Sequence, residues 1–308
     1  METCGIGMDI GGTFIRIGTV TVQNQLLAFE THDSKLLSKG PPQTAINDLE
    51  AFIRQYIERN HILGYRGIAV AFPGTIDPDR KILYSASNLG ENAKCRFDNL
   101  DIGRELTERF GVPCFLGKDT DYLLRCDVHT HKLDKSGLIG GIYFGTGIGS
   151  SFIYHGESFY GKNGVAGEIG HLPISERNLP CTCGHRGCCE SIASGWRLRQ
   201  IHQEFFPETP LDNLFEEHRN APPLQVFIND ISRVISLTGN LLDCNTTVIG
   251  GGILAMAGFP RDQLVELTME KLRSPYPRNG YDLIFSTTGQ KSGVLGAAYF
   301  LFDHFKLW

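Results

Sequence analysis

The stretch Asp9-Ile10-Gly11-Gly12-Thr13 decides how the rest of the chain is interpreted, because it closes an apolar strand expected at Cys4–Ile10. Glycines at this point let backbone N–H groups approach phosphate oxygens, and the Thr13 hydroxyl can donate a further hydrogen bond. Asp9 would then lie near the metal ion of a magnesium nucleotide. Taken alone, the stretch is explained equally well by a plain β-hairpin turn.

A second turn of the same kind, Phe144-Gly145-Thr146-Gly147-Ile148-Gly149, follows an apolar strand expected at Leu138–Phe144. A further strand is expected at Ser150–Tyr154, so the order strand, glycine turn, strand occurs twice. Such a duplication is typical of the actin-like ATPase fold. The sequence therefore predicts an α/β protein with the actin-like ATPase (ribonuclease H-like) two-domain fold and an interdomain cleft. Neither turn fits a Walker A motif or a dinucleotide-binding fingerprint, which disfavours P-loop and NAD enzymes.

The length of 308 residues allows two domains. The smaller is expected at 1–117 together with a C-terminal helix at about 290–308. The larger is expected at 118–289 and includes a cysteine-rich loop at 167–190. Apolar periodicity predicts helices at 44–60, 100–110, 119–129, 191–205, 211–218, 224–242, 261–273 and 292–305.

A third glycine cluster, Gly250-Gly251-Gly252, follows a strand expected at Thr247–Ile249. It offers room for a flat ligand such as adenosine against the backbone, although a glycine-rich strand end is an equally good interpretation by itself. Together the three clusters predict an ATP site formed by Asp9, Gly11, Gly12, Thr13, Gly145, Thr146, Gly147, Gly251 and Gly252.

Asp119 follows a strand expected at Val112–Leu116 and begins a helix. A carboxylate there could accept the proton of a substrate hydroxyl while a phosphoryl group is transferred in line. Capping of the helix is the other use of an aspartate at this position, and both roles are compatible.

The segment GEIGHLPISERNLPCTCGHRGCCE, residues 167–190, carries the strongest single signal. One imidazole and three thiols suit a closed tetrahedral zinc site formed by His171, Cys181, Cys183 and Cys188. Free cysteines in a surface loop are the alternative. Zinc here would also fix Glu168 and Glu190, which could bind a polar ligand. The single short cysteine unit and the lack of a basic cluster disfavour a nucleic-acid-binding zinc module.

Composition restricts the class of protein and the cellular location that are expected. A hydrophobic fraction of 41%, a charged fraction of 20% and a net charge of −5 are ordinary for a globular chain and disfavour a nucleic-acid partner. The N-terminus is not expected to be a signal peptide, and no apolar run reaches the roughly 18 residues of a membrane span. An odd number of cysteines fits a reducing compartment, so a cytoplasmic location is expected.

The chain resembles the ROK family (repressors, open reading frames and sugar kinases) over essentially its full length. The motifs that carry the resemblance are DIGGT at 9–13, FPGTID at 72–77, Ser87-Asn88-Leu89, FGTGIG at 144–149, GVAGEIGH at 164–171 and CTCGHRGCCE at 181–190. The resemblance implies an ATP- and Mg²⁺-dependent kinase with structural zinc, Asp119 as base and a homodimeric assembly. It further implies a hexose whose hydroxyls bond Asn88, Glu168, His171 and Glu190.

Three positions depart from the family pattern. Lys118 and Asp121 stand where the family usually has asparagine, on either side of Asp119. Lys118 is kept among the expected sugar contacts, but lysine only donates hydrogen bonds, so hydroxyl recognition should change. Phe14 replaces a usual lysine, and Arg16 could supply the missing positive charge.

Segments 194–225 and 259–268 resemble the D-allose kinase branch of the family, so phosphorylation of the 6-hydroxyl of D-allose is expected. Glucokinase activity, or activity on mannose, fructose or N-acetylhexosamines, is the alternative within the class. A sugar-sensing repressor would need a DNA-binding domain ahead of the first strand, and only eight residues precede Asp9. A zinc-stabilised sugar-binding protein without kinase activity is the remaining alternative.

Overall fold

The computed structural model describes residues 3–86, 89, 96–287 and 289–307. The chain divides into two compact units. Unit 1 contains Met1–Lys132, Tyr160–Ala166 and Thr288–Trp308, and unit 2 contains Leu133–Phe159 and Gly167–Thr287. Each unit has its own five-stranded sheet. Among the described residues, no helix has the length and apolar composition needed to cross a membrane.

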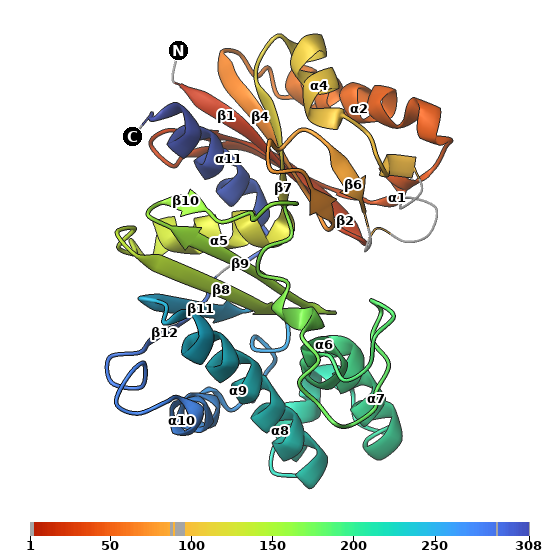
Figure 1. Cartoon of the computed structure of the whole chain (residues 1–308). Helices are drawn as coiled ribbons and strands as arrows, with labels where there is room; N and C mark the ends of the chain where they lie inside the picture. The colour runs from red at the N-terminus through yellow and green to blue at the C-terminus, as the bar shows by residue number, and fades with distance from the viewer. Residues whose placement is uncertain (1–2, 87–88, 90–95, 288, 308) are drawn as a thin grey trace. The chain divides into compact units, whose positions relative to one another are not determined.

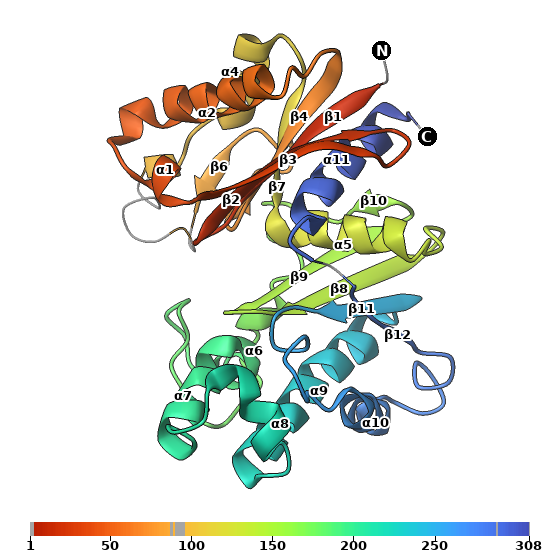
Figure 2. The same ribbon diagram turned by 180° about the vertical axis from the view of Figure 1, so that it is seen from behind.

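The sheet of unit 1 has the strand order β3-β2-β1-β4-β7 (Figures 1 and 2). Its first three strands run antiparallel, and β4 and β7 run parallel to β1. The strands are β1 (Cys4–Ile10), β2 (Phe14–Thr21), β3 (Leu26–Asp33), β4 (Tyr65–Phe72) and β7 (Cys114–Lys118). A small hairpin of β5 (Thr75–Ile76) and β6 (Leu83–Ser85) lies beside them.

Large and small side chains alternate along β4, so the two faces of this sheet differ and pack against different helices. Ile68, Val70 and Phe72 pack in one core with helices α2 (Ala45–Arg59) and α4 (Ile102–Phe110). Ala69 and Ala71 face the opposite core, with α5 (Asp119–Thr130) and α11 (Ser292–Phe305). Figures 1 and 2 show α2 and α4 on one side of the sheet and α11 on the other. The short α1 (Lys35–Ser38) and η1 (Pro42–Thr44) precede α2.

The close approach of α11 to the sheet depends on small residues. A Cβ atom on Gly7 of β1 would lie 2.1 Å from the carbonyl oxygen of Val294, well inside any tolerable contact. The apolar stripe of α11, including Val294, Ala297 and Leu301, is fully buried there. Residues near the C-terminus therefore complete the core that the first strand begins.

Unit 2 repeats the topology of unit 1, with the strand order β10-β9-β8-β11-β12. Again three antiparallel strands are extended by two parallel ones. The strands are β8 (Leu138–Phe144), β9 (Ile148–Tyr154), β10 (Glu157–Ser158), β11 (Thr246–Gly250) and β12 (Asp282–Phe285). One large core joins this sheet to the helices that follow. These are η2 (Ile169–His171), α6 (Cys189–Ala193), α7 (Gly195–Phe205), η3 (Leu211–Asn213), α8 (Leu214–His218), α9 (Pro222–Leu242) and α10 (Arg261–Lys271).

Two elements and the domain boundary differ from the expectations in ways that affect the candidate site. The helix expected at 191–205 is broken at Ser194, which is extended and caps α7 by accepting a hydrogen bond from the Arg197 N–H. The strand expected at 112–116 lies two residues later, so Asp119 follows it directly. The expected domain boundary at residue 117 precedes α5, whereas unit 1 includes α5, because this helix packs against α11 through Tyr122 and shares its core.

Candidate functional site

Asp9 of β1 and Asp119, the first residue of α5, both belong to unit 1, and the charge of Asp9 acts on Asp119. Arg16 of β2 faces Asp9, with 3.6 Å between Arg16 Nη1 and Asp9 Oδ2. Burial raises the pKa of Asp9, and the charge of Arg16 opposes that shift without cancelling it. A buried carboxyl group near the end of β1 therefore faces the positive charge of Arg16.

Asp119 is the first residue of α5, after the cap residue Lys118. Its Oδ1 accepts a hydrogen bond of 2.7 Å from the Thr120 N–H, so the carboxylate turns toward the start of its own helix. Burial, and then the negative charge of Asp9, raise the pKa of Asp119 to about 6, although the Thr120 N–H and Lys118 act in the opposite direction. A carboxyl with a pKa near neutrality is well matched to accept a proton from a hydroxyl group.

The first glycine turn, between β1 and β2, is exposed and internally hydrogen-bonded. The Gly11 N–H donates to the Phe14 carbonyl at 2.9 Å. Ser34 fixes the outer part of the turn, since its N–H donates to the Thr13 carbonyl at 3.0 Å and its hydroxyl donates to the Gly12 carbonyl at 2.8 Å. The conformation of the turn is thus set by the chain itself, which is the condition for a preformed anion-binding loop.

The second glycine turn, between β8 and β9, is anchored on the start of α7. The N–H groups of Gly195 and Trp196 donate to the carbonyls of Gly145 and Thr146, at 2.8 and 3.0 Å. Glu190 closes the turn from the other side and accepts a hydrogen bond of 3.0 Å from the Ile148 N–H. A Cβ atom on Gly147 would lie 2.3 Å from Glu190 Oε2, so a larger residue there would displace the Glu190 carboxylate.

The third glycine cluster lies beside the second turn, because β11 pairs with β8 and aligns Gly250 with Tyr143. Gly251 has φ of +99°, and a Cβ atom there would lie 2.4 Å from the Phe144 carbonyl oxygen. The Ile253 N–H donates to the same carbonyl at 3.1 Å. Two of the three predicted nucleotide-binding segments are therefore neighbours within unit 2.

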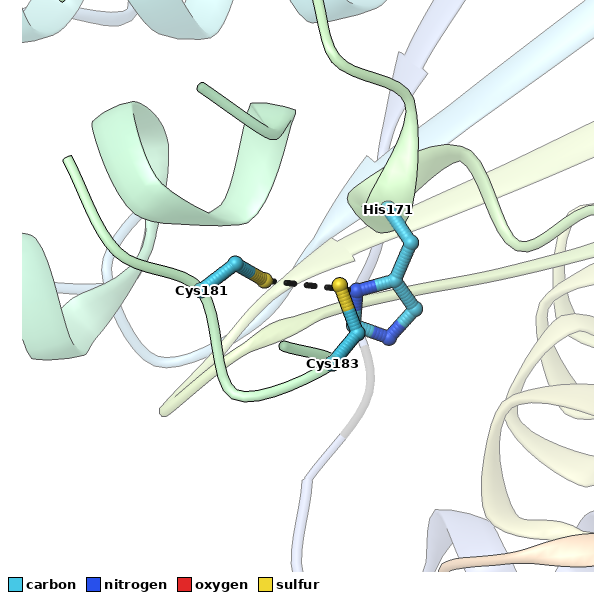
Figure 3. A group of neighbouring side chains, drawn as sticks. All are labelled: His171, Cys181 and Cys183. Carbon is cyan, nitrogen blue, oxygen red and sulfur yellow. Dashed lines mark hydrogen bonds between the residues drawn. The ribbon is translucent and has the colours of Figure 1, made fainter. Parts of the chain in front are cut away.

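The cysteine-rich loop gathers the ligand atoms of His171, Cys181 and Cys183 within 4.8 Å of one another (Figure 3). Cys181 Sγ lies 3.5 Å from His171 Nδ1, and Cys183 Sγ lies 3.7 Å from Cys188 Sγ. Tetrahedral zinc with bonds of about 2.3 Å to sulfur and about 2.0 Å to nitrogen sets S···N at about 3.5 Å and S···S at about 3.8 Å. The two observed separations match those edges, while the group within 4.8 Å comprises His171, Cys181 and Cys183, and Cys188 adjoins it through Cys183.

Two carboxylates flank this loop. His171 Nε2 lies 4.0 Å from Glu168 Oε2, on the side of the ring away from Cys181. Glu190 Oε1 accepts a hydrogen bond of 3.1 Å from the Thr182 hydroxyl, and its other oxygen is bonded to the glycine turn. The 4.0 Å between His171 and Glu168 is an ion-pair distance, longer than the hydrogen bond by which carboxylates commonly orient metal-binding histidines. The loop therefore places Glu168 and Glu190 beside one cluster.

Other predicted residues are placed as follows. Asn88 lies outside the described residues. Lys118 is buried at the end of β7, and Phe14 is half exposed, with the Arg16 guanidinium 5.4 Å from the centre of its ring. Cys188 belongs to the cysteine cluster through Cys183.

Two features near the carboxylates were not anticipated from sequence. Gly293 in the first turn of α11 packs on Asp9, since a Cβ atom there would lie 2.7 Å from the Asp9 carboxyl carbon. Arg80 forms a buried ion pair with Asp121. Both contacts join segments far apart in the chain, and neither is carried by a local sequence motif.

The comparison with known proteins identifies the family. The ROK family model matches residues 5–304, so the chain belongs to the ROK family. It is 25% identical over 317 residues to a glucokinase of Thermotoga maritima, with 95% of each chain covered. It is 24% identical to the xylose repressor of Bacillus spizizenii, over 97% of this chain and 77% of the repressor.

The fold is likewise shared with a solved structure, the ROK hexokinase from Thermus thermophilus. The TM-score is 0.78 at 22% identity, covering 99% of this chain and 100% of the hexokinase. The predicted actin-like ATPase fold, with its two α/β units, is thereby confirmed.

Proposed function

We propose that this chain is an ATP-dependent hexose kinase, which transfers the γ-phosphoryl group of ATP to the 6-hydroxyl of a hexose. The observation that carries the proposal is Asp119, a carboxylate at the start of α5 with a pKa near 6. The similarity to a glucokinase along 95% of the chain supports it. Phosphoryl transfer needs positioning and charge stabilisation more than covalent chemistry, and the residues described supply groups for both.

The roles of the residues follow from their chemistry. Asp119 accepts the proton of the attacking hydroxyl, whose oxygen bonds to the γ-phosphorus as ADP leaves. Magnesium would enter with ATP as part of the substrate, and Asp9 is the carboxylate assigned to it. The nucleotide contacts are assigned to Gly11, Gly12 and Thr13 in unit 1. In unit 2 they are assigned to Gly145, Thr146, Gly147, Gly251 and Gly252.

Sugar recognition is assigned to Glu168, His171 and Glu190, with Asn88 and Lys118 as further contacts. Carboxylates accept hydrogen bonds from hydroxyl groups, whereas Lys118 can only donate. We propose D-allose as the preferred hexose, on the resemblance of segments 194–225 and 259–268 to that branch of the family. Glucose, mannose, fructose and N-acetylhexosamines are the competing substrates.

The test is a coupled ADP-release assay with ATP, Mg²⁺ and these five kinds of sugar. The proposal expects sugar-dependent turnover, with the highest kcat/KM for D-allose. A higher value for glucose or mannose would retain the kinase and overturn the allose assignment. Absence of turnover with every hexose would overturn the kinase itself and favour a sugar-binding protein.

We also propose that His171, Cys181, Cys183 and Cys188 hold a structural zinc ion. The match of the two measured separations to tetrahedral edges supports this, as does the chemistry of one imidazole and three thiols. Bound zinc would supply a closed cross-link within the loop and so fix Glu168 and Glu190. Metal analysis of the purified protein tests the site, with one zinc per chain expected.

A sugar-sensing regulator is the second candidate function, because the chain also resembles a xylose repressor over 97% of its length. Tight binding to its own operator DNA, weakened by salt and released by a sugar, would support that reading. The kinase proposal expects no such binding. We further propose a cytoplasmic homodimer, and sedimentation equilibrium tests the assembly.

A further inference from the structure

A buried ion pair lies immediately beside Asp119. Arg80 stands between β5 and β6 with φ of +62°, a left-handed conformation that is uncommon for residues other than glycine. Its guanidinium pairs with the Asp121 carboxylate, and the two side chains are only 4% and 7% exposed. Asp121 belongs to the first turn of α5, so the pair reaches the helix turn that also carries Asp119.

The backbone of Arg80 reaches the other side of Asp119. Its carbonyl accepts a hydrogen bond of 2.9 Å from the Leu116 N–H of β7, and its own N–H donates to the Asp77 carbonyl at 3.0 Å. Leu116 precedes Asp119 by three positions, and Asp121 follows it by two. One residue therefore holds both the strand that leads into Asp119 and the helix turn that leaves it.

A third contact ties Arg80 to a distant segment of unit 1. The guanidinium carbon lies 3.4 Å from the centre of the Tyr160 ring, which is a close stacking arrangement. The segment Tyr160–Ala166 is closed by a hydrogen bond of 3.0 Å from the Ala166 N–H to the Tyr160 carbonyl. It also sits on β5, since a Cβ atom on Gly164 would lie 1.7 Å from the Ile76 carbonyl oxygen.

The other side-chain N–H groups of Arg80 show how much its burial depends on the ion pair with Asp121. Arg80 Nε and Nη1 are buried and have no hydrogen-bond partner among the described residues. Burying an arginine with donors left unmade is costly, so the pair with Asp121 and the stack on Tyr160 are the interactions that retain it. An arginine kept at such a cost at the junction of β7 and α5 points to a role beyond packing.

We propose that Arg80 is a positioning residue for Asp119, which fixes the β7–α5 junction through Leu116 and Asp121 and neutralises the second carboxylate of that helix turn. The inference rests on the proposed role of Asp119 as base and deepens it. Arg80 acts through Asp121 and the backbone and is assigned no contact with substrate.

The charges around Asp119 show why neutralisation matters. Asp9 approaches it from β1, Lys118 from β7 and Asp121 from α5 itself, while Arg16 of β2 acts on Asp9. Loss of the Arg80 charge would leave Asp121 without its arginine partner and add a negative charge beside a carboxylate that already faces Asp9. The first effect should be a higher pH for the ionisation of Asp119.

The kinetic test uses Arg80→Gln, Asp121→Asn and the double variant, with Arg104→Gln as the control. Arg104 pairs with Asp101 on the surface and is 71% exposed, so this control removes the same charge without disturbing the buried pair. Arg80→Gln should lower kcat at least tenfold, change the sugar KM little, and move the acidic limb of the kcat profile upward by about one pH unit. Asp121→Asn should move that limb downward, and the double variant should return it toward the wild-type position.

A second measurement does not depend on turnover. The protein labelled with ¹³C at aspartate carboxyl groups is titrated by NMR, and Asp119→Asn identifies the Asp119 signal. The titration midpoint of Asp119 should rise in Arg80→Gln and fall in Asp121→Asn. An unchanged midpoint in both variants, with the fold retained by circular dichroism, would overturn the positioning role even if the enzyme proves to be a kinase.

The two measurements separate the possible failures. If no hexose is phosphorylated but the midpoints shift as expected, the kinase proposal fails and the coupling of Arg80 to Asp119 stands. If Arg80→Gln does not fold, the double variant decides the question, because its Asp119 midpoint should lie above that of Asp121→Asn only if the Arg80 charge acts on Asp119. A loss of stability without any shift of midpoint or acidic limb would reduce Arg80 to a structural residue and overturn the proposal.

Discussion

The Ile148 N–H donates to Glu190 Oε2 at 3.0 Å and thereby joins the second glycine turn to the cysteine-rich loop. The other oxygen of Glu190 accepts from Thr182 inside that loop. A single carboxylate thus connects a segment proposed to bind nucleotide with one proposed to bind sugar and zinc. A change in the cysteine-rich loop should therefore alter the conformation of the second glycine turn.

Substitution of Glu190 tests this connection. Glu190→Ala should lower the free energy of unfolding by about 1–3 kcal/mol, because the Ile148 N–H loses its acceptor, and should raise the KM for both the sugar and ATP. Glu190→Gln retains an acceptor and should affect the sugar KM mainly. Urea unfolding and steady-state kinetics measure the two effects. Thr182→Val is the matched control, since it removes only the hydrogen bond to Glu190 Oε1. If the ATP KM of Thr182→Val were as high as that of Glu190→Ala, the proposed connection would be contradicted.

Asp119→Asn should lower kcat by about 10²–10⁴, while sugar binding is retained, because the amide cannot accept the hydroxyl proton. For the wild-type protein, kcat should rise with pH through about 6, where Asp119 ionises in the folded state. A pH–rate profile and a sugar-binding titration measure these effects. Wild-type kcat in the variant would remove Asp119 from the role of base.

The same substitution should stabilise the folded protein at alkaline pH. Because the pKa of Asp119 is raised by folding, its contribution to stability is fully present below its unfolded pKa and is lost as pH rises through about 6. An uncharged asparagine avoids that loss, so Asp119→Asn should gain at most about 3 kcal/mol at pH 8 and little at pH 4. Urea unfolding at both pH values measures the gain. Asp212→Asn is the control, because the Asp212 carboxylate is exposed. An equal gain in the free energy of unfolding for Asp212→Asn would contradict the assignment of the raised pKa to Asp119.

Removal of the proposed metal should destabilise unit 2. Cys183→Ser should lose zinc and lower Tm by about 5 °C or more, as expected when roughly 2 kcal/mol is lost from a domain of this size. It should also raise the sugar KM, because Glu168 and Glu190 flank the cluster. Metal analysis and calorimetry provide the readouts. His185 lies in the same loop, and His185→Ala keeps the backbone hydrogen bonds there, so this variant serves as the control. Equal Tm values for Cys183→Ser and His185→Ala would contradict a structural metal.

Adjacent glycines provide a matched pair at the end of β11. Gly251→Ala should lower the free energy of unfolding by about 1–3 kcal/mol, since φ is +99° and the added Cβ would meet the Phe144 carbonyl. Gly252→Ala should change it by no more than about 0.5 kcal/mol, since nothing lies within 4 Å of its added Cβ. Urea unfolding of the two variants decides the point, and equal losses would show that the strain at Gly251 is not what the structure implies.

Local patterns were sufficient to predict much of the fold. Apolar strands followed by glycine turns were predicted at Asp9–Thr13 and Gly145–Gly149, and the structure has a strand and turn at each. The errors have local causes. Pro113 cannot donate to a strand partner, so β7 begins only at Cys114. The helix break at Ser194 was missed because the apolar periodicity continues across it.

The candidate site was predictable where its residues are close in sequence. The spacing of the cysteines indicated the cluster with His171, and the strand end indicated Asp119. The partners of the carboxylates were not predictable in this way. Arg80 and Asp121 are separated by 41 positions, and Gly293 reaches Asp9 only through the packing of α11 on β1. Such contacts depend on the tertiary fold and leave no periodic pattern.

The packing of α11 on β1 and β4 sets the order in which the newly made chain can fold. Residues 3–132 are made before unit 2, yet α5 covers only part of the sheet face that carries Ala69 and Ala71, and residues 292–305 complete the cover. Unit 2 has all its strands and helices before that helix is made. Unit 2 can therefore fold first, whereas unit 1, although begun earlier, keeps part of this apolar face uncovered until α11 has been made, and chaperones have access to it during that time.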